Sequence, residues 1–213
     1  MKVGILGSGM VGQALGAGLA AHGHDVTLGT RDPSQDKVKA WVEATGHGVK
    51  AATFADAAAS ADLVFVATNW EGTQNALELA GKGNLAGKVV VDVTNPLKQG
   101  AAGPELALGF SDSGGEQVQR WLPDAKVVKA FNIVTAGTMI SPKREEGVPD
   151  MLIAGNDAAA KAKVTEILTQ LGWPTIDLGG IEASRLLEPL AMIWIRYALQ
   201  NKVFSHAWKL LRK

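Results

Sequence analysis

The spacing of apolar residues along the first 30 positions changes from a continuous run to a helical period and back. Lys2–Leu6 is an apolar run that ends at a glycine, which is typical of a short buried strand. From Met10–Ala21 small and apolar residues recur at helical spacing, and residues 25–29 have the pattern of a second strand. This order predicts a βαβ unit with a right-handed crossover.

The alternation of strand and helix patterns continues along most of the chain. Further strands, each apolar and bounded by turn residues, are predicted at residues 49–52, 63–67, 89–93, 126–130, 151–154 and 175–178. Their continuous apolar character suits a parallel sheet that is covered on both faces. The predicted fold class is therefore α/β, a doubly wound, mostly parallel Rossmann sheet. Residues 99–115 and 141–150 are expected to be loops, the first of them mobile.

The last part of the chain has the pattern of one long amphipathic helix. Its apolar residues stand at i, i+3 and i+4 spacing: Leu186, Leu187, Leu190, Ile193, Trp194, Tyr197 and Ala198. Pro189 predicts a kink near Leu187, and the charges of Arg185, Glu188 and Arg196 argue against a membrane span. We expect residues 1–180 to form a nucleotide-binding domain and residues 181–213 a helical segment that packs on it and closes its cleft.

Charge and composition exclude several classes of function. The 213 residues carry 21 Lys+Arg and 21 Asp+Glu, so no global field attracts nucleic acid or an anionic membrane. The absence of cysteine excludes disulfides, thiolate nucleophiles and cysteine-ligated metals. His22, His24, His47 and His206 are expected on the surface, and no metal site is expected. Because the N-terminus enters a strand directly, without a signal-peptide pattern, a cytoplasmic location is expected.

A glycine motif follows the first predicted strand and opens the first predicted helix. The motif is Gly7, Ser8, Gly9, Met10, Val11 and Gly12. In the G-x-G-x-x-G fingerprint the glycines provide a tight turn, close approach to a pyrophosphate, and close helix–strand packing. The helix N-terminus adds unpaired N–H groups and a positive dipole end. The motif predicts a dinucleotide site, and a tight turn without a ligand is the alternative.

The end of the second predicted strand indicates which dinucleotide is bound. An NAD enzyme usually has an acidic residue there for the ribose 2′-hydroxyl, whereas this chain has Thr30 and Arg31. A hydroxyl and a guanidinium suit a 2′-phosphate, and Lys37 adds a second positive charge. NADP(H) is therefore predicted. In the alternative reading Asp32 binds the ribose and Arg31 is a solvated surface charge.

With these motifs, the chain resembles the family of coenzyme F420-dependent NADP oxidoreductases over nearly its whole length. The resemblance rests on the glycine motif, on Thr30-Arg31, on Asn69-Trp70-Glu71, and on Ser184-Arg185-Leu186-Leu187-Glu188. The chain is also similar to the cytosolic NADPH-binding domain of the six-transmembrane metalloreductases. That similarity lies in Asp92-Val93-Thr94-Asn95, in Val127-Val128-Lys129-Ala130-Phe131-Asn132 and in Gly155-Asn156-Asp157.

The resemblance implies roles for individual residues. Ser8 to Val11 would hold the pyrophosphate and adjoining ribose, and Thr30 with Arg31 the 2′-phosphate. The nicotinamide end would be lined by Asn69, Trp70, Asn95 and Asn132. For each asparagine the alternative is a helix cap or a turn, and Trp70 would otherwise cover the sheet.

Lys129 falls within the predicted strand at residues 126–130. It is expected to be an edge lysine whose charge reaches solvent. Pairing with an acid or donating a proton is the alternative.

The resemblance further implies hydride transfer between NADP(H) and a flat redox acceptor, a deazaflavin such as coenzyme F420 or a flavin. Such a reaction needs little acid–base help, so no catalytic residue is assigned. The acceptor would bind between the asparagine loops and residues 186–194. A non-catalytic NADPH sensor or carrier is the alternative. Trp194 and Trp208, expected to be exposed, suggest a homodimer face.

Overall fold

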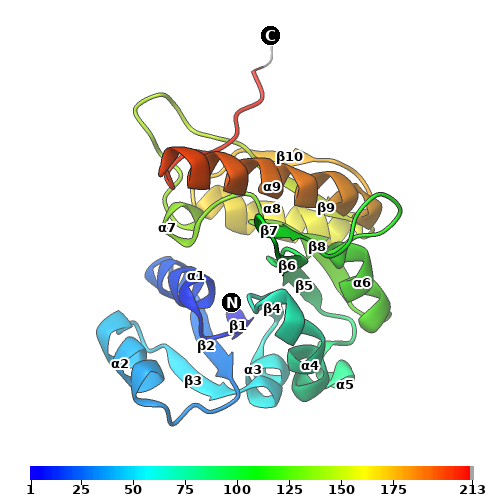
Figure 1. Ribbon diagram of the computed structural model, residues 1–213. Helices are drawn as coiled ribbons and strands as arrows, with labels where there is room; N and C mark the ends of the chain where they lie inside the picture. Colours follow the sequence, from blue (N-terminus) through cyan, green and yellow to red (C-terminus); the bar gives the residue numbers. More distant parts are fainter. Residues whose placement is uncertain (212–213) are drawn as a thin grey trace.

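A single eight-stranded sheet forms the centre of the computed structural model, which describes residues 1–211 (Figure 1). Its strand order is β10-β9-β8-β5-β4-β1-β2-β3, and every neighbouring pair is parallel except β8 with β9. The strands are β1 (Lys2–Leu6), β2 (Asp25–Thr30), β3 (Lys50–Thr53), β4 (Leu63–Val66), β5 (Val89–Asp92), β8 (Lys126–Lys129), β9 (Met151–Gly155) and β10 (Thr175–Asp177). The predicted doubly wound Rossmann sheet is confirmed, with strand ends within one residue of those expected.

Helices cover both faces of the sheet. One buried cluster joins the sheet to α1 (Met10–Ala21), α2 (Asp36–Thr45), α7 (Ala136–Met139) and α8 (Ala158–Gln170). A second buried cluster joins the other face to α3 (Phe54–Ser60), α4 (Trp70–Ala80), α5 (Lys82–Leu85) and α6 (Gly114–Trp121). Because the sheet is apolar on both faces, its carboxyl edge is the place where polar loops collect.

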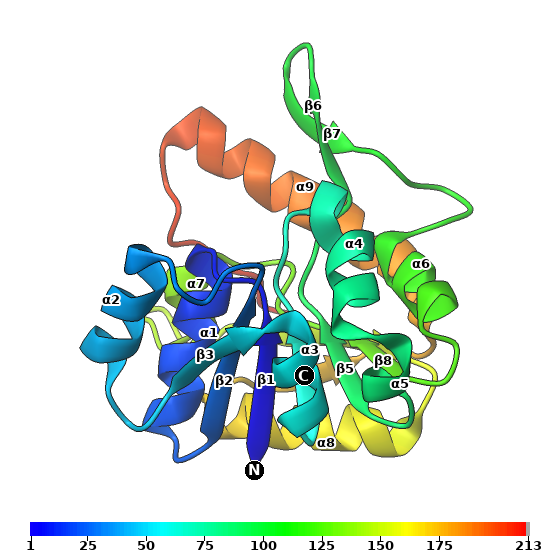
Figure 2. The ribbon, with the colours of Figure 1, turned by 90° about the horizontal axis from the view of Figure 1, so that it is seen from below.

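The segment expected to be a mobile loop at residues 99–115 contains regular structure. Strands β6 (Leu97–Gly100) and β7 (Gly103–Leu106) form an antiparallel hairpin, and α6 begins before the segment ends. Gly103 supplies the turn with a φ of 115°, a conformation that side chains other than glycine rarely adopt. The hairpin projects beyond the carboxyl edge of the sheet (Figure 2). Residues 141–150 are irregular apart from one bridge between Arg144 and Gly147, as expected.

The C-terminal region is a short η1 turn (Ile181–Ala183) followed by α9 (Ser184–Asn201). The expected kink does not interrupt α9, which runs on through Pro189. Pro189 has no N–H to donate to the carbonyl of Arg185, and both residues are half-exposed. No helix of residues 1–211 is long and apolar enough to cross a membrane.

Two expectations about surface residues are wrong. The segment after α9 folds back, and the indole of Trp194 donates to the carbonyl oxygen of His206 at 2.7 Å. Trp194 is therefore buried and Trp208 half-buried, rather than exposed. His24 is also buried, with its Nε2 2.9 Å from Oε1 of Gln170. His24 contacts a residue 146 positions away, and Trp194 is covered by a segment that folds back without a periodic pattern, so local spacing shows neither burial.

Candidate functional site

The glycine motif forms the turn between β1 and α1, and each of its glycines has a separate steric reason. Gly7 has a φ of 128°, and a β-carbon there would overlap the carbonyl oxygen of Ala67. A β-carbon at Gly12 would overlap the carbonyl oxygen of Gly7. At Gly9, in contrast, a β-carbon would stand in open space among residues 1–211. Gly7 and Gly12 are therefore required by the fold, whereas Gly9 leaves room for a ligand.

Hydrogen bonds hold this turn in place. Ser8 Oγ donates to Thr30 Oγ1 at 3.2 Å, and Gln13 Nε2 donates to the carbonyl oxygen of Ser8 at 3.1 Å. Gly9 is the N-cap residue of α1 and brings no side chain to cover the N–H groups of the first turn. These groups and the helix dipole form an anion-binding end at the carboxyl edge of the sheet.

A cavity of about 440 Å³, here called the glycine-loop cavity, opens beside this turn. The predicted residues Gly7, Ser8, Gly9, Thr30, Arg31, Lys37 and Asn69 are among its lining residues. Gln35, Phe54 and Asn75 also line it and were not predicted, because they belong to no ligand motif. Glu71, which stands in the Asn69-Trp70-Glu71 segment of the family resemblance but was given no role there, lines it too. Thr30 ends β2, Arg31 and Lys37 follow it in the sequence, and all three residues line the same cavity.

Asp32 takes no part in this cavity. Its Oδ1 accepts hydrogen bonds from the hydroxyl and the backbone N–H of Ser34, at 2.6 and 2.9 Å. These bonds, the hydroxyl first, hold the pKa of Asp32 below its usual range. The carboxylate is engaged within its own loop, which disfavours the reading in which Asp32 binds the ribose.

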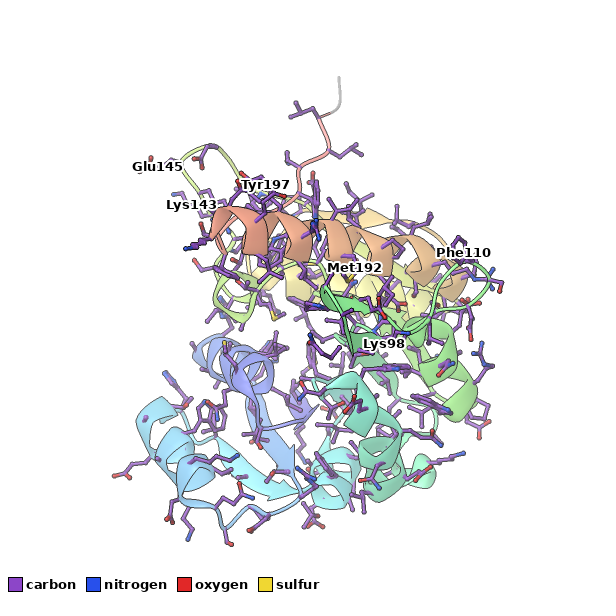
Figure 3. The ribbon with its side chains drawn as sticks, in the orientation of Figure 1. Lys98, Phe110, Lys143, Glu145, Met192 and Tyr197 are labelled. Carbon is purple, nitrogen blue, oxygen red and sulfur yellow. The ribbon has the colours of Figure 1, made fainter. Side chains whose placement is uncertain are left out.

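A second cavity of about 690 Å³, here called the hairpin cavity, adjoins the first and shares Gly9, Ala67, Thr68, Asn69 and Glu71 with it. The predicted residues Met10, Val11, Trp70 and Asn95 line it. The residues of its other wall were not predicted from the sequence. They are Leu97, Lys98, Gln99 and Pro104 of the hairpin, with residues 134–136. Figure 3 shows Lys98 on this hairpin. The sequence does contain a signal for this hairpin, since glycines at positions 100 and 103 flank a two-residue turn.

Asn132 and Gly12 are the two predicted residues that line neither cavity. Asn132 is buried, and its Nδ2 donates to Asn95 Oδ1 at 3.0 Å and to the carbonyl oxygen of Leu187 at 3.1 Å. The side chain of Asn95 in turn donates to the carbonyl oxygen of Asn132 at 2.8 Å. Asn132 thus links the cavity wall to α9 instead of lining the cavity.

Trp70 lies over Trp121 with ring centroids 5.4 Å apart.

The expectation that Lys129 is an edge lysine reaching solvent is wrong. Its side chain is fully buried, and its Nζ lies 2.8 Å from Asp92 Oδ2 and 2.8 Å from Glu188 Oε1. Burial alone lowers the pKa of a lysine, but the two carboxylates outweigh it and raise the pKa of Lys129 above its ordinary value. Lys129 therefore pairs with acids, which was the less favoured reading of the sequence.

Helix α9 borders a different depression from the one expected. A groove of about 1020 Å³ is lined by residues 106–110, by Leu178 and by the first turns of α9, including Arg185, Leu186 and Pro189. Within residues 1–211, no residue of α9 lines the glycine-loop cavity or the hairpin cavity. The helix supports the hairpin cavity from behind, through Leu187 and Glu188.

The donor set of the glycine-loop cavity fits a phosphorylated dinucleotide. It combines an open approach at Gly9, the N-terminus of α1, and the hydroxyl, guanidinium and ammonium groups of Thr30, Arg31 and Lys37. Both cavity volumes fall in the range of roughly 300–1000 Å³ typical of ligand pockets. In residues 1–211 no group of three or more His, Asp or Glu side chains could hold a metal ion.

Comparisons with known proteins agree with this geometry. The family model described as NADP oxidoreductase coenzyme F420-dependent matches residues 2–96. An F420-dependent NADP reductase of Methanocaldococcus jannaschii is 30% identical over 213 residues, covering 95% of this chain and 94% of the relative. The crystal structure of a protein described as an F420-dependent NADP-reductase, from Arthrobacter sp. FB24, has a TM-score of 0.93 and 42% identity. That match covers 100% of both chains.

A further relative is a larger protein. Metalloreductase STEAP3 of Rattus norvegicus is 31% identical over 192 residues. The match covers 90% of this chain but only 36% of the metalloreductase, so the chain spans about a third of the length of that relative.

Proposed function

Since the chain belongs to the family of coenzyme F420-dependent NADP oxidoreductases, we propose that it transfers hydride between NADP(H) and a flat redox acceptor, a deazaflavin or a flavin. The observation that carries the proposal is the pairing of a phosphate-binding glycine turn with an adjoining, wider cavity. The first suits the nucleotide and the second suits the nicotinamide with its acceptor.

The cofactor would lie across the carboxyl edge of the sheet. Ser8 to Val11, with the N-terminus of α1, would hold the pyrophosphate and the adjoining ribose. The 2′-phosphate would contact Thr30, Arg31 and Lys37. Asn69, Trp70 and Asn95 would border the nicotinamide, which supplies the hydride when NADPH is bound. Asn132 would position Asn95 from behind.

The residues of the hairpin cavity provide binding, orientation and shielding from water. Val11, Val93, Pro104 and Val134 give it apolar walls, which suit a planar ring system. Lys98 of the hairpin also lines the cavity, and its ammonium group pairs with the carboxylate of Glu105 at 3.3 Å, so it brings little net charge to this wall. Hydride transfer between two bound rings needs their reacting atoms held about 3–3.5 Å apart, so a rigid wall matters more than a proton donor.

For the domain organisation we propose residues 1–180 as the nucleotide-binding domain and residues 181–213 as a segment packed on it. Contacts of Glu188 and Leu187 with the sheet and with Asn132 support this division. The last two residues of that segment, 212 and 213, lie outside the described residues.

Replacing Arg31 by alanine tests the cofactor assignment. A charge-assisted hydrogen bond is worth about 1.5–3 kcal/mol, so Arg31→Ala should weaken NADPH binding roughly 10- to 150-fold. NADH has no 2′-phosphate, and its dissociation constant should hardly change. Titration of both nucleotides by calorimetry measures this difference.

The matched control is Lys39→Ala, which removes an exposed positive charge of α2 outside the lining of the cavity. It should leave both dissociation constants within about twofold, since Lys39 does not line the cavity and salt screens the charge of an exposed side chain. Equal losses of NADPH and NADH binding in Arg31→Ala would contradict the 2′-phosphate assignment.

We propose a homodimer formed through the outer face of α9. Leu186, Ile193 and Tyr197 lie on one side of this helix and are 68%, 57% and 50% exposed. Figure 3 shows Tyr197 on α9. A row of exposed apolar side chains is unusual on a monomer and suits an isologous contact between two copies. The sequence suggested a dimer face at Trp194 and Trp208, but Trp194 is buried and Trp208 is half-buried, so we propose this face of α9 instead.

Light scattering coupled to gel filtration tests the dimer. The wild-type chain should have the mass of two copies, and Ile193→Glu should shift it to one copy, because a buried unpaired carboxylate is costly. Leu79→Glu is the control, since Leu79 is similarly exposed, at 49%, but lies on α4. A monomeric wild type, or equal effects of the two variants, would contradict the proposed face.

A further inference from the structure

Asp92, Lys129 and Glu188 form a buried charge cluster beneath the hairpin cavity, and their side chains are 0%, 0% and 2% exposed. The three donors of the Lys129 ammonium group reach Asp92 Oδ2 at 2.8 Å, the carbonyl oxygen of Thr94 at 2.7 Å, and Glu188 Oε1 at 2.8 Å. The cluster joins β5, β8 and α9, three elements that are far apart in the sequence.

The cluster binds every polar atom of Thr94. Asp92 Oδ1 accepts hydrogen bonds from the backbone N–H of Thr94 at 2.9 Å and from its hydroxyl at 2.7 Å. Lys129 binds its carbonyl oxygen. Thr94 and Asn95 line the hairpin cavity directly above the cluster. The conformation of this part of the wall is therefore set by the buried charges.

Glu188 connects the same wall to two other segments. Its carboxylate accepts hydrogen bonds from the N–H groups of Gly114 at 2.9 Å and Gly115 at 3.0 Å, in the first turn of α6. The amides of this helix end balance the second negative charge of the cluster. The preceding residue, Leu187, accepts from Asn132, which in turn donates to Asn95.

Buried ion pairs are a weak source of stability, because apolar residues of similar volume often stabilise a core as well. What the cluster provides that apolar residues do not is a fixed hydrogen-bonded geometry for Thr94. We propose that Glu188 and Asp92 are positioning residues, which act through Lys129 to hold Thr94 and Asn95 in place for the acceptor. This inference rests on the proposed function, since it assigns the hairpin cavity to the acceptor.

Glu188→Gln tests the proposal in the full-length protein. Glutamine keeps the size of glutamate, but its amide nitrogen is a donor and would face either the Lys129 ammonium or an N–H of α6. Hydrogen exchange at residues 93–97 should accelerate about tenfold or more, whereas exchange at residues 7–12 should stay within about twofold. The dissociation constant of coenzyme F420, added to the NADPH complex, should rise about tenfold, with little change for NADPH.

Asp92→Asn is the second variant, because its amide nitrogen would face either the Lys129 ammonium or the two donors of Thr94, whereas the pair of Lys129 and Glu188 is kept. This variant should likewise accelerate hydrogen exchange at residues 93–97 and weaken F420 binding, with little change in NADPH binding. Glu166→Gln, the same chemical change on the exposed face of α8, is the control and should alter none of these quantities.

Unchanged exchange at residues 93–97 in a folded variant would overturn the proposal. So would equal losses of NADPH and F420 binding, since these would show a general loss of structure. If the wild-type protein oxidises NADPH with no acceptor, the proposed function fails, and the exchange data still decide whether the cluster holds this wall.

Discussion

Gly9→Ala is expected to weaken NADPH binding by about 100-fold, or ~2.7 kcal/mol, while leaving the fold intact. In the protein alone a β-carbon at Gly9 has open space among residues 1–211, so the change creates no internal clash. The new methyl group instead occupies the space through which a pyrophosphate approaches the N–H groups of α1. The weaker N-cap preference of alanine is offset by about 0.4–1 kcal/mol from the stiffer unfolded chain.

Gly12→Ala is the variant to compare with Gly9→Ala. Its β-carbon would overlap the carbonyl oxygen of Gly7 in the protein itself, so α1 and β1 must move apart. Overpacking of this kind costs typically 1–3 kcal/mol, which lowers the melting temperature of a chain this size by roughly 2–12 °C. We therefore expect Gly12→Ala to reduce stability and binding together, and Gly9→Ala to reduce binding alone.

Gly83→Ala is the control for both variants, because a β-carbon in the exposed helix α5 meets open space far from either cavity. Thermal unfolding and NADPH titration of the three variants separate the effects. A Gly9→Ala protein that binds NADPH as tightly as the wild type would show that the glycine turn does not carry the pyrophosphate.

Much of the fold can be predicted from the sequence because the signals are local. Runs such as Leu63–Val66 are apolar at every position, as buried parallel strands require, and the helices between them have an apolar period. The hairpin of β6 and β7 was missed because its strands are short and half-exposed, which weakens the apolar pattern. The glycines of residues 99–115 predict a mobile loop, whereas Gly103 forms the turn of the hairpin.

The candidate site was predictable where backbone conformation requires a particular residue type. Gly7 and Gly12 are examples, since only glycine fits each place, and Arg31 follows β2 directly. Lys129 was assigned wrongly because its partners Asp92 and Glu188 are 37 and 59 positions away, a proximity that only the folded sheet creates. The burial of Trp194 was not predicted for a different reason, because the segment around His206 that covers it has no periodic pattern to show that it folds back.

The identity of the hydride acceptor has the largest consequence for the function of the protein. The hairpin cavity has the size and apolar walls for a planar ring, and the relatives named above include F420-dependent reductases and a metalloreductase. An oxidoreductase should oxidise NADPH at a rate that saturates with at least one acceptor. A sensor or carrier that only binds NADPH should show no acceptor-dependent oxidation at all.

The most direct test of the central claim is stopped-flow absorbance of NADPH oxidation by the pure protein, with coenzyme F420, FMN, FAD and ferric chelates offered in turn. We predict saturable oxidation with F420 or a flavin, and its loss in Gly9→Ala at NADPH concentrations that saturate the wild type. Tight NADPH binding without oxidation by any acceptor would contradict the account and favour a sensor or carrier.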